Sequence, residues 1–451
     1  MSSYQTRPTP GDTAWFRHDR FGMFIHFGLY ALPARHEWIK TRELISEEKY
    51  DQYFSHFDPD LLDAREWARQ AKAAGMKYAI LTAKHHEGFC LFDSAYTDYK
   101  STATPFGRDL LREFVDAFRA EGLRVGLYYS LIDWHHPQFP IDRLHPRRFD
   151  ENAEELDRGR DMRVYAEYMR NQVTELLTNY GKIDILWFDF SYTQENYFTA
   201  PVDYKPWMQY GGWKGKDEWE AEALIATARA LQPDIMIDNR TQLEQDVWTP
   251  EQFQPTEWVK DKKTGELVTW EACQTMSGSW GYFRDEMTWK SPEILLNLLV
   301  DTVSLGGNLL MNVGPTARGY LDHRAEAALA VYADWMKYNS RAIYGCTMAE
   351  PEFVAPEGTR LTQSEDGRRL YIHLKTYPFL SLMMRGLAKR IAYAQFLHDG
   401  SEVLYTTGRA ADGCGDGSGF TKDAEAVFFR LPPVKPHCAL PVIEVFLKEE
   451  G

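Results

Sequence analysis

A short apolar run that ends on a carboxylate constrains this chain most: residues 183–190 read IDILWFDF and carry Asp189 near their end. A run this short and this rich in Ile, Leu, Trp and Phe indicates a strand buried on both faces. Burying a carboxylate costs free energy unless a partner pairs with it. That cost falls at the C-terminal end of a parallel strand, where closed α/β barrels build their active sites. The alternative is a structural Asp paired with an Arg or with a helix N-terminus.

Similar apolar runs alternate with helical patterns through most of the chain. The expected strands are 21–28, 78–84, 124–130, 183–190, 235–240, 270–276 and 307–314, and the expected helices are 58–75, 108–121, 160–180, 217–231, 291–305 and 323–337. Residues 145–160 and 241–268 lack this periodicity and are expected to be irregular. The alternation predicts parallel strands joined by right-handed crossovers. The length suits a (β/α)8-type barrel with one strand irregular or missed. A doubly wound sheet is the alternative, but no GxGxxG follows the first strand.

The pattern changes near residue 350. Helical signals fade, and short alternating runs such as RLYIHLK, AVFFRL and VIEVFL are separated by Gly, Asp and Pro. Such runs predict an antiparallel β-sandwich of about 100 residues. We therefore expect two domains, an α/β catalytic barrel over 1–347 and a C-terminal β-sandwich over 348–451.

Composition excludes several classes of partner. The formal net charge of -15 argues against nucleic acid and acidic membranes. No run approaches 18 apolar residues, so no membrane span is expected. Five scattered Cys without CxxC spacing indicate reduced thiols and no structural zinc. Because residues 1–20 lack the apolar region of a signal peptide, we expect a cytoplasmic protein. The oligomeric state is not fixed by sequence, so a homo-oligomer stays open.

Polar residues recur at or just past the ends of the expected strands. They are His26, His85, His86, Tyr128, Asp189, Arg240, Glu271 and Asn312. With 14 Trp in the chain, this mixture suits a polyhydroxylated ligand whose hydroxyls take hydrogen bonds and whose ring takes an aromatic face. A large aromatic core explains the Trp content equally well. We expect no metal and no cofactor, because neighbouring His on a strand point to opposite faces and no HxH or HExxH is present.

Glycoside cleavage needs two carboxylates, one as nucleophile or base and one as proton donor. Asp189 supplies the first. The second has three candidates, Glu251 in WTPEQ, Glu257 in TEWV and Glu271 in TWEACQTM. Their local spacing does not decide between them.

A series of motifs, in order, resembles the glycoside hydrolase family 29 α-L-fucosidases. The motifs are FGMFIHFGLYALP, HEWI, AGMKYAILTAKHHEGF, VGLYYSLIDW, LWFDF, WTPEQ, WEACQTMSGSWGY and SLGGNLLMNVGP. The resemblance runs from about residue 14 to 345, and the KHHEGF and GGNLLMNVGP blocks are its most specific parts. The C-terminal region resembles the family's β-sandwich in length and character only.

The resemblance implies a metal-free, retaining exo-glycosidase. It places the nucleophile at Asp189 and the acid/base at Glu251, with Glu271 as the second choice. The positions that match sugar contacts are His26, Glu37, Trp38, His85, His86, Tyr128, Trp187, Arg240 and Trp280. Two departures stand out. Phe190 follows the nucleophile where many members carry Gly, and NSRAIYG at 339–345 replaces the usual NGEAIYG.

The expected function is that of a retaining exo-α-L-fucosidase acting on a small carbohydrate substrate. Two alternatives stay open. One is a carbohydrate-binding protein with a non-catalytic site, and the other is an α-L-galactosidase, whose substrates add one hydroxyl at C6.

Overall fold

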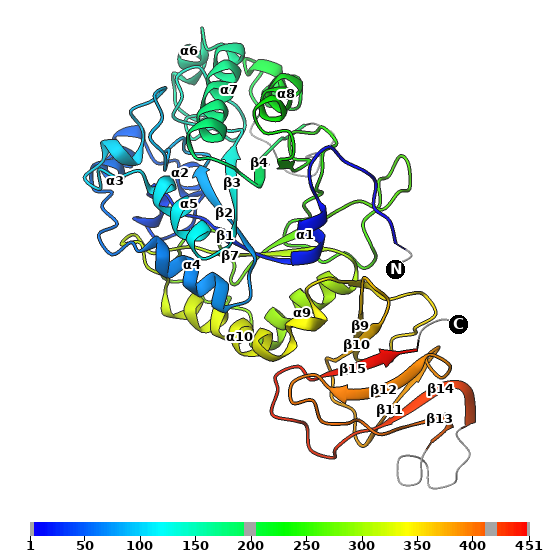
Figure 1. Cartoon of the computed structure of the whole chain (residues 1–451). Coiled ribbons are helices and arrows are strands. Elements are labelled where there is room, and N and C mark those ends of the chain that lie inside the picture. The colour runs from blue at the N-terminus through cyan, green and yellow to red at the C-terminus, as the bar shows by residue number, and fades with distance from the viewer. Residues whose placement is uncertain (1–3, 194–203, 411–421, 449–451) are drawn as a thin grey trace.

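The larger part of the molecule is a curled parallel sheet wrapped by helices (Figure 1). The computed structural model describes residues 4–193, 204–410 and 422–448. Seven parallel strands pair in the order β5-β4-β3-β2-β1-β7-β6. They are β1 (Phe21–Ile25), β2 (Tyr78–Lys84), β3 (Arg124–Ser130), β4 (Ile185–Asp189), β5 (Met236–Ile237), β6 (Glu271–Thr275) and β7 (Asn308–Val313). The prediction of parallel strands joined through helices is thus confirmed.

Helices follow the strands as the periodicity predicts. The predicted ones are α4 (Ala64–Ala73), α5 (Leu110–Ala120), α7 (Met162–Asn179), α8 (Ala221–Leu231), α9 (Pro292–Ser304) and α10 (His323–Asn339). The side chain of Asp63 accepts hydrogen bonds from the first backbone N–H groups of α4, so that helix begins at residue 64 instead of 58. No helix in the described part of the chain has the length and apolarity to cross a membrane.

Several short helices lie where none was expected. They are α1 (Ala14–Asp19), α2 (Ile39–Arg42), α3 (Glu47–Ser55) and α6 (Ala153–Asp157). The last corrects the prediction that 145–160 is a loop. Its five residues are too few to show apolar periodicity, and Asp157 holds the helix in place by accepting a hydrogen bond from the Ile141 backbone N–H at 2.6 Å. Tertiary contacts of this kind leave no local pattern in sequence.

The strand expected at 235–240 is reduced to the two residues of β5. The Asp246 carboxylate accepts a hydrogen bond from the Ile237 backbone N–H at 2.8 Å, which draws the chain away from the sheet. Residues 246–252 then run between the two edge strands. They make isolated parallel bridges to Asp238 on one side and to Trp270 and Cys273 on the other. Both edges of the sheet therefore have backbone partners.

The C-terminal part consists of two antiparallel sheets. One has the order β12-β15-β10-β9-β8 and the other β11-β14-β13. Their strands are β8 (Cys346–Met348), β9 (Thr359–Ser364), β10 (Arg369–Leu374), β11 (Ser381–Arg385), β12 (Ile391–Phe396), β13 (Tyr405–Arg409), β14 (Lys422–Arg430) and β15 (Val442–Leu447). Side chains from both sheets, among them Ile372, Val445, Met384 and Phe429, share one apolar core. The sequence did not predict β8, β9 and β11.

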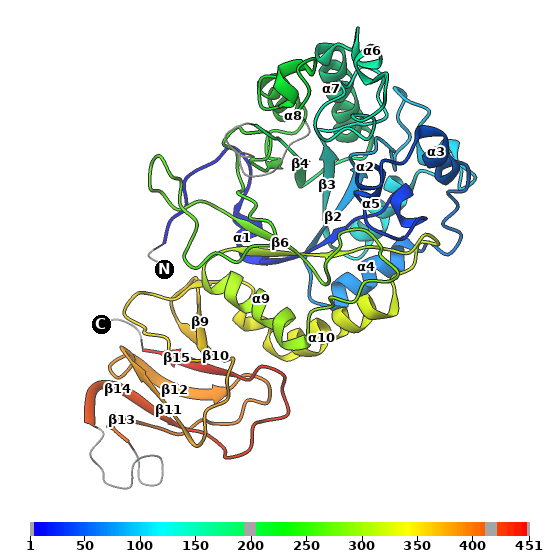
Figure 2. The ribbon, with the colours of Figure 1, turned by 180° about the vertical axis from the view of Figure 1, so that it is seen from behind.

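The two parts pack against each other through α9 and α10, which lie between the parallel sheet and the C-terminal strands (Figures 1 and 2). Trp335 of α10 donates from Nε1 to the Leu440 carbonyl at 2.8 Å. The buried Arg20 guanidinium donates to the Cys346 carbonyl at 2.8 Å. Leu440 and Val442 belong to the same apolar cluster as the helices of the larger part. Strand β8 begins two residues before the boundary predicted at 348.

Truncation after residue 348 is expected to give insoluble protein. It removes Leu440 and Val442 from the cluster that covers α10 and leaves the Trp335 indole without its acceptor, so an apolar surface opens to water. Fractionation of an expressed truncate checks this. Trp335→Phe, which removes the hydrogen bond and part of the ring but keeps the C-terminal strands in place, is the control and should remain soluble. A soluble and fully active truncate would contradict the prediction.

Candidate functional site

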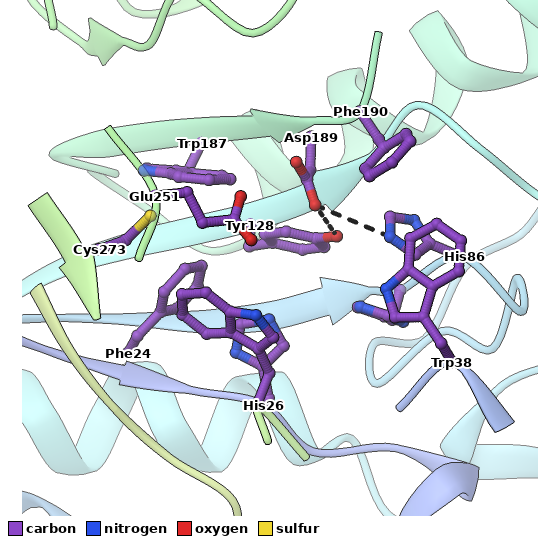
Figure 3. Close-up of a pocket in the computed structure, with 12 residues that line it drawn as sticks. Phe24, His26, Trp38, His86, Tyr128, Trp187, Asp189, Phe190, Glu251 and Cys273 are labelled. Atoms are coloured by element: carbon purple, nitrogen blue, oxygen red, sulfur yellow. Dashed lines mark hydrogen bonds and ion pairs between the residues drawn. The ribbon is translucent and has the colours of Figure 1, made fainter. Parts of the chain in front are cut away.

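Asp189 is the last residue of β4, and its side chain opens into a cavity at the C-terminal end of the parallel strands (Figure 3). Its Oδ2 accepts a hydrogen bond from the Tyr128 hydroxyl at 2.7 Å, and His86 Nε2 lies 3.8 Å from the same oxygen. Its Oδ1 faces Arg240. The carboxylate is thus held on both oxygens, which limits its free rotation.

Arg240 joins Asp189 to Glu251. Its Nη1 donates to Asp189 Oδ1 at 3.0 Å and to Glu251 Oε2 at 2.7 Å. Nε and Nη2 donate to the hydroxyl and carbonyl of Thr249, and the guanidinium lies 4.6 Å from the Trp187 ring centre. The guanidinium is therefore fixed in place. Because Asp189 Oδ1 and Glu251 Oε2 lie 3.0 and 2.7 Å from the same nitrogen, they can be no farther from each other than the sum of these two distances.

Charge and burial compete at Asp189. Burial raises the pKa of Asp189 to about 6, and the neighbouring Glu251 carboxylate adds to the rise. The Arg240 charge and the hydrogen bonds from Tyr128 and Arg240 act in the opposite direction. The carboxyl group is therefore mostly ionised at neutral pH.

The cavity is small, and its wall consists largely of aromatic and imidazole rings. It is lined by Phe24, His26, Trp38, His85, His86, Tyr128, Trp187, Asp189, Phe190, Glu251, Cys273 and Trp280. Burial lowers the pKa of His26, His85 and His86, that of His85 to about 3. These imidazoles are neutral, and each offers one hydrogen-bond donor and one acceptor.

His85 and His86 lie on the same side of the chain, contrary to the expectation for neighbours on a strand. Strand β2 ends at Lys84, so the alternation of strand side chains stops before them. Their ring centres are 4.1 Å apart, and both rings line the cavity. His86 Nδ1 pairs with the Ser130 hydroxyl at 2.7 Å, and His85 Nδ1 faces Glu87 at 3.3 Å.

Glu37 was expected to contact the ligand but does not line the cavity. Its Oε2 accepts hydrogen bonds from the backbone N–H groups of Gly281 at 2.9 Å and Trp280 at 3.2 Å. Burial raises the pKa of Glu37 to about 7. In this structure Glu37 holds the segment that presents the Trp280 ring to the cavity.

Glu271 lies at the opposite end of the sheet interior. It is the first residue of β6, and its carboxylate accepts a hydrogen bond from the Tyr78 hydroxyl at the start of β2. Burial raises the pKa of Glu271 to about 8, and the hydrogen bond from the Tyr78 hydroxyl opposes the rise. Glu251 lines the cavity and Glu271 does not, while the third candidate, Glu257, is exposed and pairs with Lys260.

Three lining residues, Phe24, Phe190 and Cys273, were not among the predicted site residues. Phe24 shares a face of β1 with His26, because side chains two apart on a strand point the same way. That spacing was the signal that could have identified it.

Asn312, expected at a strand end, pairs with His26 Nδ1 at 2.6 Å and donates to the Trp280 carbonyl at 2.6 Å.

One set of three potential metal ligands is found in the described part of the chain. It comprises Glu47, Asp51 and His135. None of them lines the cavity that holds Asp189.

Comparison with known proteins identifies the family. The sequence model described as Alpha-L-fucosidase matches residues 1–341. The chain is similar to a tissue alpha-L-fucosidase of Bos taurus, with 30% identity over 419 residues, 84% of this chain and 78% of the relative. Among solved structures it is similar to alpha-L-fucosidase isoenzyme 1 from Paenibacillus thiaminolyticus, with 42% identity, a TM-score of 0.86 and coverage of 97% and 99% of the two chains. A GH29 alpha-L-fucosidase from Bacteroides thetaiotaomicron, solved as a trapped covalent intermediate with 2-fluoro-fucosyl fluoride, is 25% identical with a TM-score of 0.78, covering 99% and 98% of the two chains.

The buried Glu271 carboxyl predicts a pH dependence of stability. Its pKa of about 8 in the folded protein exceeds the ordinary 4.5, so the folded chain binds more protons than the unfolded chain between these values. The free energy of unfolding should therefore fall as pH rises from about 4.5 to 8, by at most about 1.4 kcal/mol per pH unit for this group. Glu271→Gln should flatten this dependence in urea unfolding at pH 5 and pH 8. The exposed Glu266→Gln is the control, and an unchanged slope in Glu271→Gln would contradict the assignment.

Proposed function

This chain belongs to the α-L-fucosidase family and is a glycoside hydrolase, and from that premise we propose that it is a retaining exo-enzyme that releases terminal L-fucose from α-fucosylated glycans. The ring-lined cavity at Asp189 is the place proposed for the terminal fucose. We also propose that residues 246–252 take the eighth strand position and close the barrel, and that the two C-terminal sheets form a β-sandwich. The proposed domains are 1–347 and 348–451.

The observation that carries the proposal is the shared contact of Asp189 and Glu251 with Arg240 Nη1. Distances of 3.0 and 2.7 Å from one nitrogen keep the two oxygens closer than the roughly 6.5–9.5 Å that an inverting pair needs. Retaining pairs stand about 5–5.5 Å apart, which leaves no room for water between nucleophile and sugar. A binding protein without activity would not need two carboxylates at this spacing.

In the first step of the proposed mechanism, Asp189 attacks the anomeric carbon. Glu251 donates its proton to the glycosidic oxygen as that bond breaks, and fucose remains as an ester of Asp189. In the second step the Glu251 carboxylate takes a proton from water. That water attacks the same carbon and releases fucose and free Asp189. The relative from Bacteroides thetaiotaomicron was trapped as a covalent intermediate, which supports the ester for this chain.

The proposed fucose contacts follow from the cavity wall. The neutral rings of His26, His85 and His86 supply hydrogen bonds to hydroxyls, and Trp280 offers an apolar face to the C5 methyl group. An α-L-galactoside adds a hydroxyl at C6. Because an apolar pocket rejects an added hydroxyl only by about 10²-fold, slow turnover of α-L-galactosides is compatible with the same site.

Asp189→Gly should abolish turnover of aryl α-L-fucosides and leave the fold intact. The variant lacks the nucleophile but gains space where a small anion fits, so added azide should restore turnover and give a β-fucosyl azide. Product analysis by NMR and a circular dichroism spectrum check both points. Asp189→Asn, which fills the space, is the matched control and should not respond to azide. A near-wild-type rate in Asp189→Gly would exclude Asp189 as nucleophile.

Glu251→Ala should slow the hydrolysis of fucosylated oligosaccharides by about 10²–10⁴-fold, the usual contribution of general acid catalysis. Aryl fucosides with an acidic phenol should be slowed far less in their first step, because a good leaving group needs little protonation. Azide should accelerate their turnover by replacing the water that Glu251 activates. Glu271→Ala should slow both substrate classes alike, because Glu271 lies outside the cavity. Selective loss and azide rescue in Glu271→Ala alone would assign the acid/base role to Glu271.

A further inference from the structure

The three cavity histidines differ in the group that holds Nδ1. The rings of His26, His85 and His86 all line the cavity, and each turns Nδ1 to a different partner outside the lining. A neutral imidazole carries its one N–H hydrogen on either nitrogen, so the partner of Nδ1 decides whether Nε2 donates or accepts. These partners therefore set what each ring offers to a ligand.

His26 has an acceptor as its partner. The Asn312 amide nitrogen donates to the Trp280 carbonyl at 2.6 Å, so the amide oxygen is the atom that faces His26 Nδ1, also at 2.6 Å. An amide oxygen only accepts, so His26 carries its ring hydrogen on Nδ1. The Nε2 atom of His26 is consequently an acceptor.

His86 has the same arrangement. The Ser130 hydroxyl donates its one hydrogen to the Ile132 carbonyl at 2.8 Å, which leaves its oxygen to accept from His86 Nδ1 at 2.7 Å. The Asp189 carboxylate lies 3.8 Å from His86 Nε2, too far to take a hydrogen bond from that atom. The Nε2 atom of His86 is therefore a second acceptor.

His85 has a carboxyl group as its partner. Glu87 Oε2 lies 3.3 Å from His85 Nδ1, while Oε1 is buried and has no hydrogen-bond partner among the described residues. The Glu87 side chain is 1% exposed and does not line the cavity. Gly28 packs directly on it, since a Cβ atom at Gly28 would lie 2.9 Å from Oε1. The carboxyl group is thus confined beside His85.

Ionisable groups surround the Glu87 carboxyl group. They are Lys40 of α2, Lys84 of β2, Asp133 after β3 and the hydroxyls of Tyr30, Tyr50 and Tyr99. Lys40 is paired with Glu47 at 2.9 Å. Lys84 is paired with Asp133 at 3.1 Å. Burial raises the pKa of Glu87 to about 8, because Asp133 adds to the rise and the two lysines offset only part of it. Glu87 is therefore mostly protonated at neutral pH.

The contacts also decide which oxygen of Glu87 carries the proton. A hydroxyl on Oε1 would be a buried donor without an acceptor, whereas a hydroxyl on Oε2 donates to His85 Nδ1. A ring nitrogen that accepts carries no hydrogen, so the His85 hydrogen lies on Nε2. His85 thus offers the cavity a donor where His26 and His86 offer acceptors.

We propose that Glu87 is a positioning residue that makes His85 the donor among the three cavity imidazoles, so that neighbouring hydroxyls of the bound sugar meet a fixed order of donor and acceptors. The link to the sugar rests on the proposed function, whereas the tautomers do not. When Glu87 loses its proton to solvent, it can only accept from His85 Nδ1, and the ring hydrogen moves there from Nε2. All three rings then present acceptors, and one sugar hydroxyl loses its donor.

NMR of protein labelled with nitrogen-15 histidine tests the tautomers directly, with His85 assigned from the signals lost in His85→Gln. In the wild-type protein, His85 should carry its hydrogen on Nε2 at pH 7 and on Nδ1 at pH 9, because Glu87 titrates between them. Glu87→Gln should keep it on Nε2 at both pH values, because its amide nitrogen donates to Nδ1 throughout. The exposed Glu266→Gln is the matched control and should titrate as the wild-type protein does.

Calorimetric titration with L-fucose tests the link to the sugar. Between pH 7 and pH 9 the Kd of the wild-type protein should rise about tenfold, as expected for the loss of one hydrogen bond in a buried site. The rise should be clearly smaller in Glu87→Gln. Glu37 and Glu271 have pKa values of about 7 and 8, and both remain in Glu87→Gln, so the difference between the two proteins isolates Glu87.

The outcomes separate the two proposals. A wild-type His85 hydrogen on Nδ1 at pH 7, or one that stays on Nε2 at pH 9, overturns the role of Glu87, and these spectra decide even if Glu87→Gln does not fold. A wild-type pH response of the tautomer in Glu87→Gln overturns it as well. An equal change of Kd in both proteins overturns the link to the sugar. Failure of the wild-type protein to hydrolyse aryl α-L-fucosides overturns the proposed function and leaves the tautomer result standing.

Discussion

The ion pair between Asp189 and Arg240 is the interaction on which the cavity depends. A carboxylate at the end of a buried strand is stable only with a partner, because the desolvation of an unpaired charge costs several kcal/mol. Arg240 provides that partner from the segment after β5, and Thr249 fixes the guanidinium from the neighbouring chain. The irregular segment behind the short β5 brings Arg240 and Thr249 together. A regular strand through residue 240 would continue the ladder with β4 instead of folding back toward Glu251.

The interior of the parallel sheet has a polar group at each end, and the two differ in charge. At one end Asp189 is paired with a cation and is mostly ionised at neutral pH. At the other end the Glu271 carboxyl group is hydrogen-bonded to the Tyr78 hydroxyl, and burial holds it mostly neutral at pH 7. Trp187 supports the Arg240 guanidinium at the charged end. In the proposed mechanism one buried carboxyl group carries charge for chemistry, while the other acts as a structural hydrogen-bonding group.

Much of this arrangement could be predicted from sequence, and what could not has a physical cause. The apolar runs around Phe24, Leu81 and Leu310 predicted their strands, because burial on both faces leaves a clear pattern. The apolar run into Asp189 predicted its position at the cavity. The position of Glu37 behind Trp280 could not be predicted, since both residues lie in loops whose contact joins segments far apart in sequence. The shared orientation of His85 and His86 depends on the strand ending at Lys84, and sequence patterns locate such ends only within a few residues.

The shared contact at Arg240 Nη1 also bears on how the proposed mechanism uses two carboxyl groups that lie so close together. When both groups are ionised, the Arg240 guanidinium pairs with Asp189 and Glu251 at once, and the two carboxylates repel each other. A proton on Glu251 removes that repulsion and leaves Arg240 to Asp189 alone. The first step of a retaining mechanism needs this state, an ionised nucleophile beside a protonated acid. In the proposed second step Asp189 is an ester without charge, so Arg240 pairs with Glu251 alone. The proposed mechanism therefore uses one fixed cation for each carboxylate in the step in which that carboxylate is charged.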